Sequence, residues 1–107
     1  MGKQLEFSEL IDFYGRLLTD KQLDCLMLYY NEDLSLSEIA DELQISRQGV
    51  RSFLKKGEAK LIEYEEVLGL CKRFKNISSE LDNIIDSLNK GNTDGIIQKI
   101  EEIKSEF

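Results

Sequence analysis

Polar side chains suited to nucleic-acid contact lie close together between positions 47 and 60 of this 107-residue chain. Arginine can grip guanine or phosphate with two hydrogen bonds, glutamine suits adenine, and lysine binds phosphate as a point charge. On a helix Arg47, Arg51 and Lys55 would share one face, because they recur every four residues. The candidate contacts to nucleic acid or to a protein partner are Arg47, Gln48, Arg51, Ser52, Lys55, Lys56 and Lys60.

The charge of the chain is distributed unevenly around this stretch. The whole sequence has 14 basic and 21 acidic residues, a net charge of −7, which argues against a general nucleic-acid coat or a membrane-surface protein. Residues 46–60 nevertheless carry five basic residues and one acidic residue, and both flanks are net acidic. If all five cations met phosphates, binding to B-DNA would weaken with a logarithmic salt slope of about −4.5.

A basic stripe on a helix also has interpretations that involve no nucleic acid. It can be a solvated face or a docking surface for an acidic partner, and helix-turn-helix folds also serve as protein–protein modules. The stripe alone leaves these alternatives open.

Catalytic and metal chemistry have few candidates in this sequence. The chain has no histidine, which excludes the Ser-His-Asp triad, histidine zinc ligands and histidine bases. Cys25 and Cys71 lie too far apart for a metal-binding pair, and their apolar neighbours predict buried, reduced thiols. We therefore expect no cofactor, no metal site and no enzymatic activity.

Helical spacing of apolar residues and the absence of proline predict an all-α chain. One helix is expected over residues 5–18. Thr19, Ser35 and Ser46 are the expected N-caps of three further helices. The first of these three runs to Tyr30, the second is short, and the third begins at position 47 and can continue to position 68.

Residues 35–54, SLSEIADELQISRQGVRSFL, have the layout of a helix-turn-helix. The small Ala40 lets the second helix cross closely, and Ile45 fills the turn. Gln44 occupies a position that often takes a left-handed backbone conformation and is commonly glycine, which costs any other residue about 1 kcal/mol. The expected core has three to four helices, followed by a long helix.

The last third of the chain predicts a helical hairpin. Two apolar stripes flank a turn at residues 91–95 and are expected to pack against each other or against a second chain. The expected division is a helix-turn-helix domain at 1–68 and a hairpin at 69–107 that mediates self-association, so that the protein forms a homodimer. The two stripes consist of Ile77, Leu81, Ile84, Ile85 and Leu88, and of Ile96, Ile97, Ile100, Ile103 and Phe107.

Two resemblances extend these expectations. The segment SLSEIADELQISRQGVR resembles region 4 of bacterial sigma factors, which grips promoter DNA with its second helix. The chain as a whole resembles the YlxM family of small bacterial proteins, through LIDFYGRLLTDKQLDCLMLYYNEDLSLSEIADELQISRQGV and the charged helix through EAKLIEYEEVLGL. The YlxM resemblance covers residues 5 to about 75, and the chain departs from that family's pattern at residues 51–54.

The resemblance to YlxM implies a cytoplasmic regulator of the signal recognition particle pathway that contacts the particle's RNA or its GTPase. One alternative is a dimeric transcriptional regulator that places helix 47–60 in the major groove of DNA, and another is a protein-only adaptor. Membrane insertion is not expected, because no run of about 18 apolar residues occurs.

Overall fold

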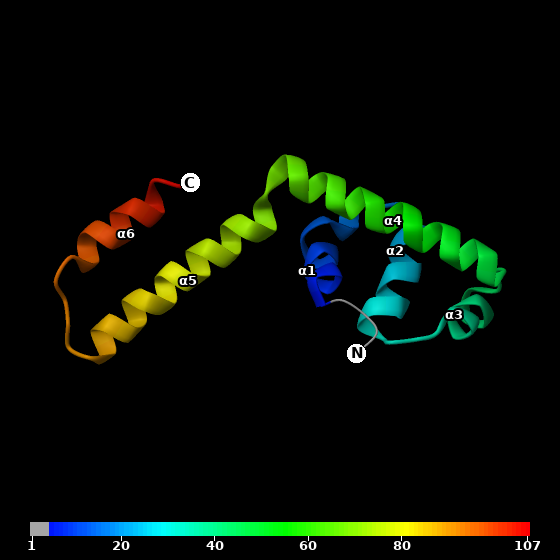
Figure 1. The fold of residues 1–107 in the computed structure, drawn as a ribbon, viewed down its shortest axis with the longest axis horizontal. Coiled ribbons are helices and arrows are strands. Elements are labelled where there is room, and N and C mark those ends of the chain that lie inside the picture. Colours follow the sequence, from blue (N-terminus) through cyan, green and yellow to red (C-terminus); the bar gives the residue numbers. More distant parts are fainter. Residues whose placement is uncertain (1–4) are drawn as a thin grey trace. The chain divides into compact units, whose positions relative to one another are not determined.

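Between residues 5 and 107 the fold consists of six α-helices with two short non-α turns (Figure 1). The structure, a computed structural model, describes residues 5–107, without the side chain of Leu5. No strand occurs in that range, which confirms the all-α class. Its contacts form two units, one ending at Cys71 and one beginning at Lys72. The elements are α1 (Leu5–Tyr14), η1 (Gly15–Leu17), α2 (Asp20–Leu26), η2 (Met27–Asn31), α3 (Leu36–Leu43), α4 (Arg47–Leu68), α5 (Leu70–Asn89) and α6 (Ile96–Lys104).

The three predicted N-caps are confirmed. The Thr19 and Ser35 hydroxyls each accept a hydrogen bond from the backbone N–H three residues on, and the glutamine or glutamate there accepts one from the cap's own N–H. The Ser46 Oγ accepts from the Gly49 N–H at 2.9 Å. These bonds satisfy N–H groups that the first turn of a helix leaves free.

The first predicted helix is shorter than expected. It ends as an α-helix at Tyr14 and tightens into the 3₁₀ turn η1, and Leu18 is extended. Gly15 is buried at this turn, where an added Cβ would lie 3.0 Å from the Leu23 Cδ1. The second predicted helix also changes geometry, since it widens from α2 into the π-helix η2.

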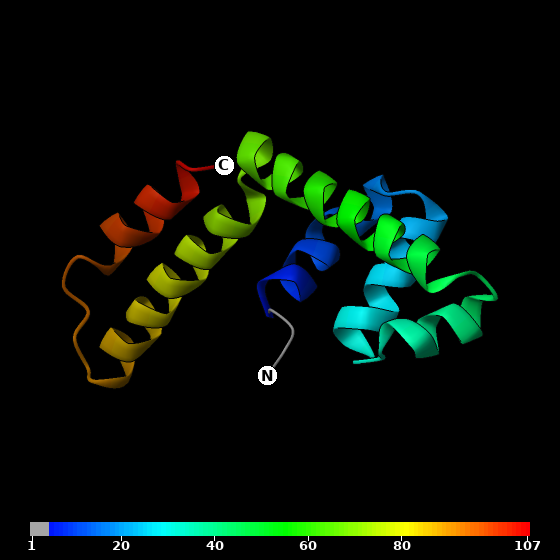
Figure 2. The ribbon, with the colours of Figure 1, turned by 45° about the vertical axis from the view of Figure 1, so that its right-hand side comes forward.

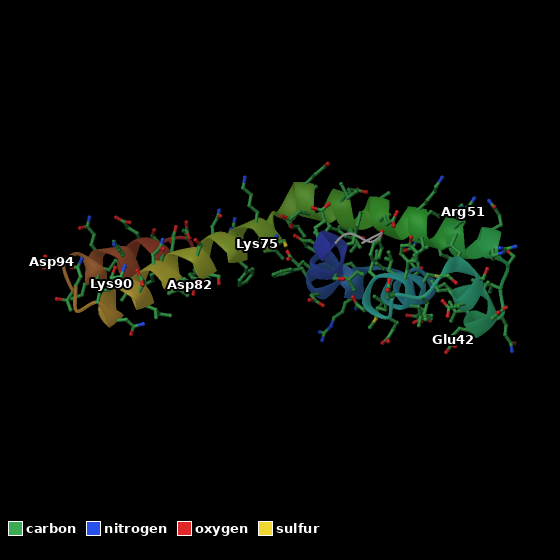
Figure 3. The ribbon with its side chains drawn as sticks, turned by 60° about the horizontal axis from the view of Figure 1, so that its bottom comes forward. Glu42, Arg51, Lys75, Asp82, Lys90 and Asp94 are labelled. Carbon is green, nitrogen blue, oxygen red and sulfur yellow. The ribbon has the colours of Figure 1, made fainter. Side chains whose placement is uncertain are left out.

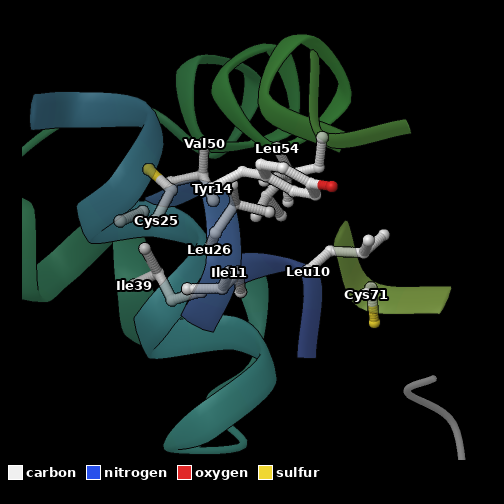
Figure 4. Packing of buried hydrophobic residues seen from close by; sticks show 11 residues of the cluster. Leu10, Ile11, Tyr14, Cys25, Leu26, Ile39, Val50, Leu54 and Cys71 are labelled. Atoms are coloured by element: carbon white, nitrogen blue, oxygen red, sulfur yellow. The ribbon is translucent and has the colours of Figure 1, made fainter. Parts of the chain in front are cut away.

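Helix α4 organises the N-terminal unit, because it packs against α1, α2 and α3 (Figures 1 and 2). Its inward face consists of Val50, Leu54, Gly57 and Leu61. Figure 4 shows the apolar side chains that meet beneath it. The buried cluster is Leu10, Ile11, Tyr14, Cys25, Leu26, Ile39, Ala40, Val50, Leu54, Leu61 and Cys71, and both cysteines are thus buried thiols as predicted.

Side chains of the N-terminal unit bind the first backbone N–H groups of α5. The Leu70 N–H donates to the Tyr14 Oη at 3.0 Å, and the Cys71 N–H donates to the Glu65 Oε1 at 3.1 Å. The Tyr14 hydroxyl in turn donates to the same Glu65 oxygen at 2.6 Å. Burial and the hydrogen bond to Glu65 raise the pKa of Tyr14 above its usual value.

The C-terminal unit contains the predicted hairpin, in which α5 and α6 run antiparallel (Figures 1 and 2). Only Ile77, Ile84, Ile96 and Ile103 are buried there. The two stripes thus pack against each other through these four isoleucines alone, and the remaining stripe residues stay exposed: Leu81, Ile85, Leu88, Ile97, Ile100 and Phe107.

The predicted turn at residues 91–95 leads into α6 without a side-chain cap. The N-cap position is Gly95 in a left-handed conformation, and no side chain bonds to the first turn. The Asn92 Oδ1 instead accepts from the Asp94 N–H, inside the turn.

None of the helices in residues 5–107 is long and apolar enough to cross a membrane.

Candidate nucleic-acid interface

Helices α3 and α4 and the turn between them form the predicted helix-turn-helix. Gln44 takes the expected left-handed conformation, with φ 55° and ψ 48°, and its N–H donates to the Ala40 carbonyl. Ile39 and Ala40 are buried where α3 meets α4. The small residue and the left-handed turn thus set up the crossing of the two helices, and Ser46 fixes where α4 begins.

Exposed positions in the first turns of α4 carry four of the predicted contacts. The side chains of Arg47, Gln48, Arg51 and Lys55 are all exposed. In Figure 3 Arg51 projects from α4 and Glu42 of α3 lies on the other side of the same unit. Cations and an amide donor therefore share the first turns of α4.

The remaining predicted residues lie differently. Ser52 is half-buried, whereas Lys56 and Lys60 are exposed. Lys60 is about 20 Å further along the helix axis than Arg47 and is turned by about 140° from it. The Lys60 Nζ lies 3.9 Å from a Glu63 carboxylate oxygen, with both side chains mostly in solvent. The fold therefore brings Arg47, Arg51 and Lys55 together but separates Lys60 from them.

Glu58 is the one acidic residue in the basic stretch 46–60. Its half-buried carboxylate accepts a hydrogen bond from the Tyr30 hydroxyl of η2. Burial, followed by this hydrogen bond, raises the pKa of Tyr30 far above its usual value. The bond holds the negative charge of Glu58 toward η2.

Arg47 is partly positioned by α3. Its Nη1 donates to the Ser37 Oγ at 3.3 Å, in an exposed position. A solvent-exposed bond of this kind contributes little to stability. It nonetheless places one guanidinium where the first turns of α3 and α4 adjoin.

Two features of this region were missed from the sequence. Gly57 is not among the residues expected to matter, although its spacing from Val50, Leu54 and Leu61 puts it on the buried face. That spacing could have identified it as a close-packing position. The hydrogen bond between Tyr30 and Glu58 joins residues 28 positions apart, so no local sequence pattern predicts it.

Among residues 5–107, no group of three or more cysteine, aspartate and glutamate side chains is arranged to hold a metal ion.

The fold and this exposed basic face define a helix-turn-helix protein. Residues 1–103 match the family UPF0122, described as "Putative helix-turn-helix protein, YlxM / p13 like". The chain belongs to this family, which confirms the resemblance to YlxM. It is 40% identical over 105 residues to a UPF0122 protein of Clostridium kluyveri, covering 98% of this chain and 95% of the relative. It is 48% identical over 102 residues to one of Thermoanaerobacter sp. strain X514, covering 92% and 87%. A UPF0122 protein of Clostridium perfringens is 41% identical over 107 residues, covering 99% and 96%.

Proposed function

We propose that the protein is a non-catalytic accessory factor of the signal recognition particle pathway that binds the particle's RNA through the exposed face of α4. The observation that carries this proposal is the grouping of Arg47, Arg51 and Lys55 on the solvent side of a helix-turn-helix. The resemblance to YlxM supports the choice of pathway and a cytoplasmic location. The absence of histidine from the sequence supports a binding role rather than a catalytic one.

Binding would depend on a local electrostatic attraction, because the basic stretch of α4 is flanked on both sides by net acidic sequence. Three cations and the free N–H groups at the start of α4 offer contacts to phosphate. The acidic residues on either side of the basic stretch reduce long-range attraction to a polyanion. Such a surface favours a short-range, salt-sensitive contact over indiscriminate coating.

Duplex DNA is the second candidate ligand. It is favoured by the exposure of Gln48 and Arg51 near the start of the second helix of the motif, where base edges in a major groove would lie. Ser52 and Lys55 complete that set of contacts. A homodimer would present two such helices, because one short helix buries too little surface for tight, specific binding.

Titration of the purified full chain with labelled ligands at two salt concentrations tests the proposal. The ligands are the particle's RNA, a DNA duplex of similar length, and the particle's purified GTPase. We expect the RNA to bind more tightly than the duplex, and binding to weaken as salt rises. Preferential binding of the duplex would favour a DNA-binding transcriptional regulator, and binding of the GTPase alone would favour a protein-only contact. Either result would overturn the proposal.

A charge-matched pair of variants shows whether α4 is the contact face. Combining Arg47→Ala with Arg51→Ala removes two charges from α4, whereas combining Lys90→Ala with Lys99→Ala removes two charges from the hairpin. We expect only the first pair to weaken RNA binding, by at least about tenfold, since each charged hydrogen bond contributes about 1 kcal/mol or more. Equal weakening by both pairs would show that overall charge, and not the face of α4, drives binding.

A further inference from the structure

A groove lies within the N-terminal unit, between η2 and the end of α3. Its volume is about 360 Å³, which is within the range of ligand pockets, and it is open to solvent. One wall comes from α2 and η2, and the other comes from α3. None of its residues is among the predicted contacts to nucleic acid. The groove is lined by Asp24, Met27, Leu28, Glu32, Glu42 and Leu43.

The floor of the groove is apolar and rests on the buried cluster of the unit. Leu28 and Leu43 are half-buried and pack against that cluster. Met27 is 43% exposed, although methionine is among the residues most often found inside proteins. Methionine adapts its shape to different partners and is common at binding surfaces. The groove therefore combines two leucines held by the core with one adaptable side chain.

The wall that carries Met27 and Leu28 has an unusual backbone. The Glu32 N–H donates to the Met27 carbonyl, five residues back, at 3.1 Å and so closes a π-helical turn. The Leu34 N–H donates to the Leu28 carbonyl at 3.0 Å. π-Helical turns are rare, and they occur frequently at functional sites. The groove therefore coincides with a backbone geometry that is itself associated with function.

Carboxylates stand on both walls of the groove. Asp24 and Glu32 lie on the side of α2 and η2, Glu42 lies on α3, and all three are exposed. None of the three forms an ion pair or a side-chain hydrogen bond with another residue of the range 5–107. Residues 20–45 contain seven acidic residues and one lysine, so the surrounding field is negative. The groove therefore attracts cations and repels phosphate.

We propose that this groove binds a basic amphipathic helix of a protein partner. Helices that bind in grooves insert apolar side chains spaced by three and four residues. Here that apolar ridge would lie on Met27, Leu28 and Leu43, and lysine or arginine side chains on its two flanks would reach the carboxylates of the two walls. Each exposed ion pair contributes little by itself, so affinity requires the apolar contact as well.

A partner protein fits the groove better than the basic helix of a second copy does. The apolar side chains of Val50 and Leu54, in the basic stretch of α4, are buried in their own unit, so that helix has no apolar ridge to offer. The groove is also separate from the candidate nucleic-acid interface, since Glu42 and Arg51 lie on different sides of the unit (Figure 3). The proposal therefore adds a protein-binding surface and does not depend on RNA binding.

Methionine-methyl NMR of the full chain tests the groove directly. The sequence has two methionines, Met1 and Met27, so a ¹³C-methyl label places a probe in the groove, and Met27→Leu identifies its signal. The ligand is a synthetic peptide of leucine and lysine in an order that forms an amphipathic helix. We expect this peptide to shift the Met27 signal in a saturable way. A peptide with glutamate in place of every lysine should leave the signal unchanged.

A charge-matched pair of variants separates the groove from the overall acidity of the chain. Combining Glu32→Gln with Glu42→Gln removes two carboxylates from the groove, whereas combining Glu66→Gln with Glu101→Gln removes two exposed carboxylates elsewhere. We expect the first pair to raise the dissociation constant of the lysine peptide about five- to tenfold and the second to change it less than about twofold. Both pairs should retain the helical circular dichroism of the wild type.

Three outcomes of the peptide titrations would overturn the proposal: an unshifted Met27 signal, equal binding of the glutamate peptide, or equal weakening by both variant pairs. A lower mass for Glu32→Gln with Glu42→Gln than for the wild type, measured by light scattering without peptide, would also overturn it, because a second copy would then occupy the groove. Combining Arg47→Ala with Arg51→Ala should not weaken peptide binding, so failure of the RNA proposal leaves this result unaffected.

Discussion

Leu26 of α2 occupies the space that a side chain at position 57 of α4 would need. A Cβ built on Gly57 would lie 2.6 Å from the Leu26 Cδ1 and 3.3 Å from its Cγ, and Leu26 itself is fully buried. The missing side chain therefore sets how closely α2 and α4 approach. Since α4 carries the candidate interface, the same contact also supports the helix that would meet the nucleic acid.

Gly57→Ala should destabilise the protein, although alanine is the better helix former. The intrinsic gain is about 1 kcal/mol, but overpacking a rigid core costs about 1–3 kcal/mol, and the buried leucine has little room to yield. We expect a net fall in the free energy of unfolding, measured by urea denaturation. Leu26→Ala alone should cost about 2–5 kcal/mol because it leaves a cavity.

The combination of the two changes isolates the clash. In the Leu26→Ala background, Gly57→Ala should be neutral or stabilising, because the leucine that it would strike is gone. Additive losses in the double variant would contradict the close-packing role of Gly57.

Gln44→Gly should stabilise the protein by about 1 kcal/mol. Gln44 has a positive φ of 55°, which glycine adopts without the steric cost that other residues bear. Glu42→Gly, two residues earlier and inside α3, should have the opposite sign because glycine weakens a helix interior. Thermal or urea unfolding of both variants measures the effect, and two losses of similar size would show that the turn imposes no strain.

Stability should fall as pH rises above about 10, partly through Tyr30. Its folded-state pKa is raised by burial and by the hydrogen bond to Glu58, so an unfolded chain releases the proton first. The unfolded state then binds fewer protons, and the free energy of unfolding decreases with pH. Tyr30→Phe should flatten this decrease. Lysines also titrate in this range, so the measurement compares how the free energy of unfolding falls with pH in the wild type and in the variant. Identical slopes in the two proteins would show that Tyr30 does not contribute.

The salt dependence of RNA or DNA binding should report individual residues of α4. Arg51→Ala should make the logarithmic slope shallower by about 0.7 on single-stranded RNA or about 0.9 on duplex DNA if Arg51 meets one phosphate. Lys60→Ala should change the slope less, because Lys60 is turned away from Arg51 and lies beside Glu63. Equal changes for both variants would indicate a diffuse contact along the whole helix.

The parts of the fold that local chemistry determines could be predicted. The caps at Thr19, Ser35 and Ser46 depend on residues three positions away, and the inward face of α4 follows from helical spacing. The bond between Tyr14 and Glu65 could not be predicted, because it joins residues 51 positions apart that only the folded core brings together.

The division of the hairpin's apolar residues into buried and exposed ones shows the same limit. Sequence spacing identifies the apolar residues of α5, but the choice of Ile84 over Leu81 as the buried one depends on how α6 lies against it. The shared face of Arg47, Arg51 and Lys55 could be predicted from their four-residue spacing, whereas the half-burial of Ser52 depends on how α4 packs in the folded unit.

The bonds from Tyr14 and Glu65 to the start of α5 determine where this protein can be divided. A fragment ending at residue 68 would lack the Leu70 and Cys71 N–H donors and the buried Cys71 side chain. A fragment ending at residue 72 or later would keep all three. Experiments on the N-terminal unit alone, including deletion series and fusions, should therefore retain the first residues of α5.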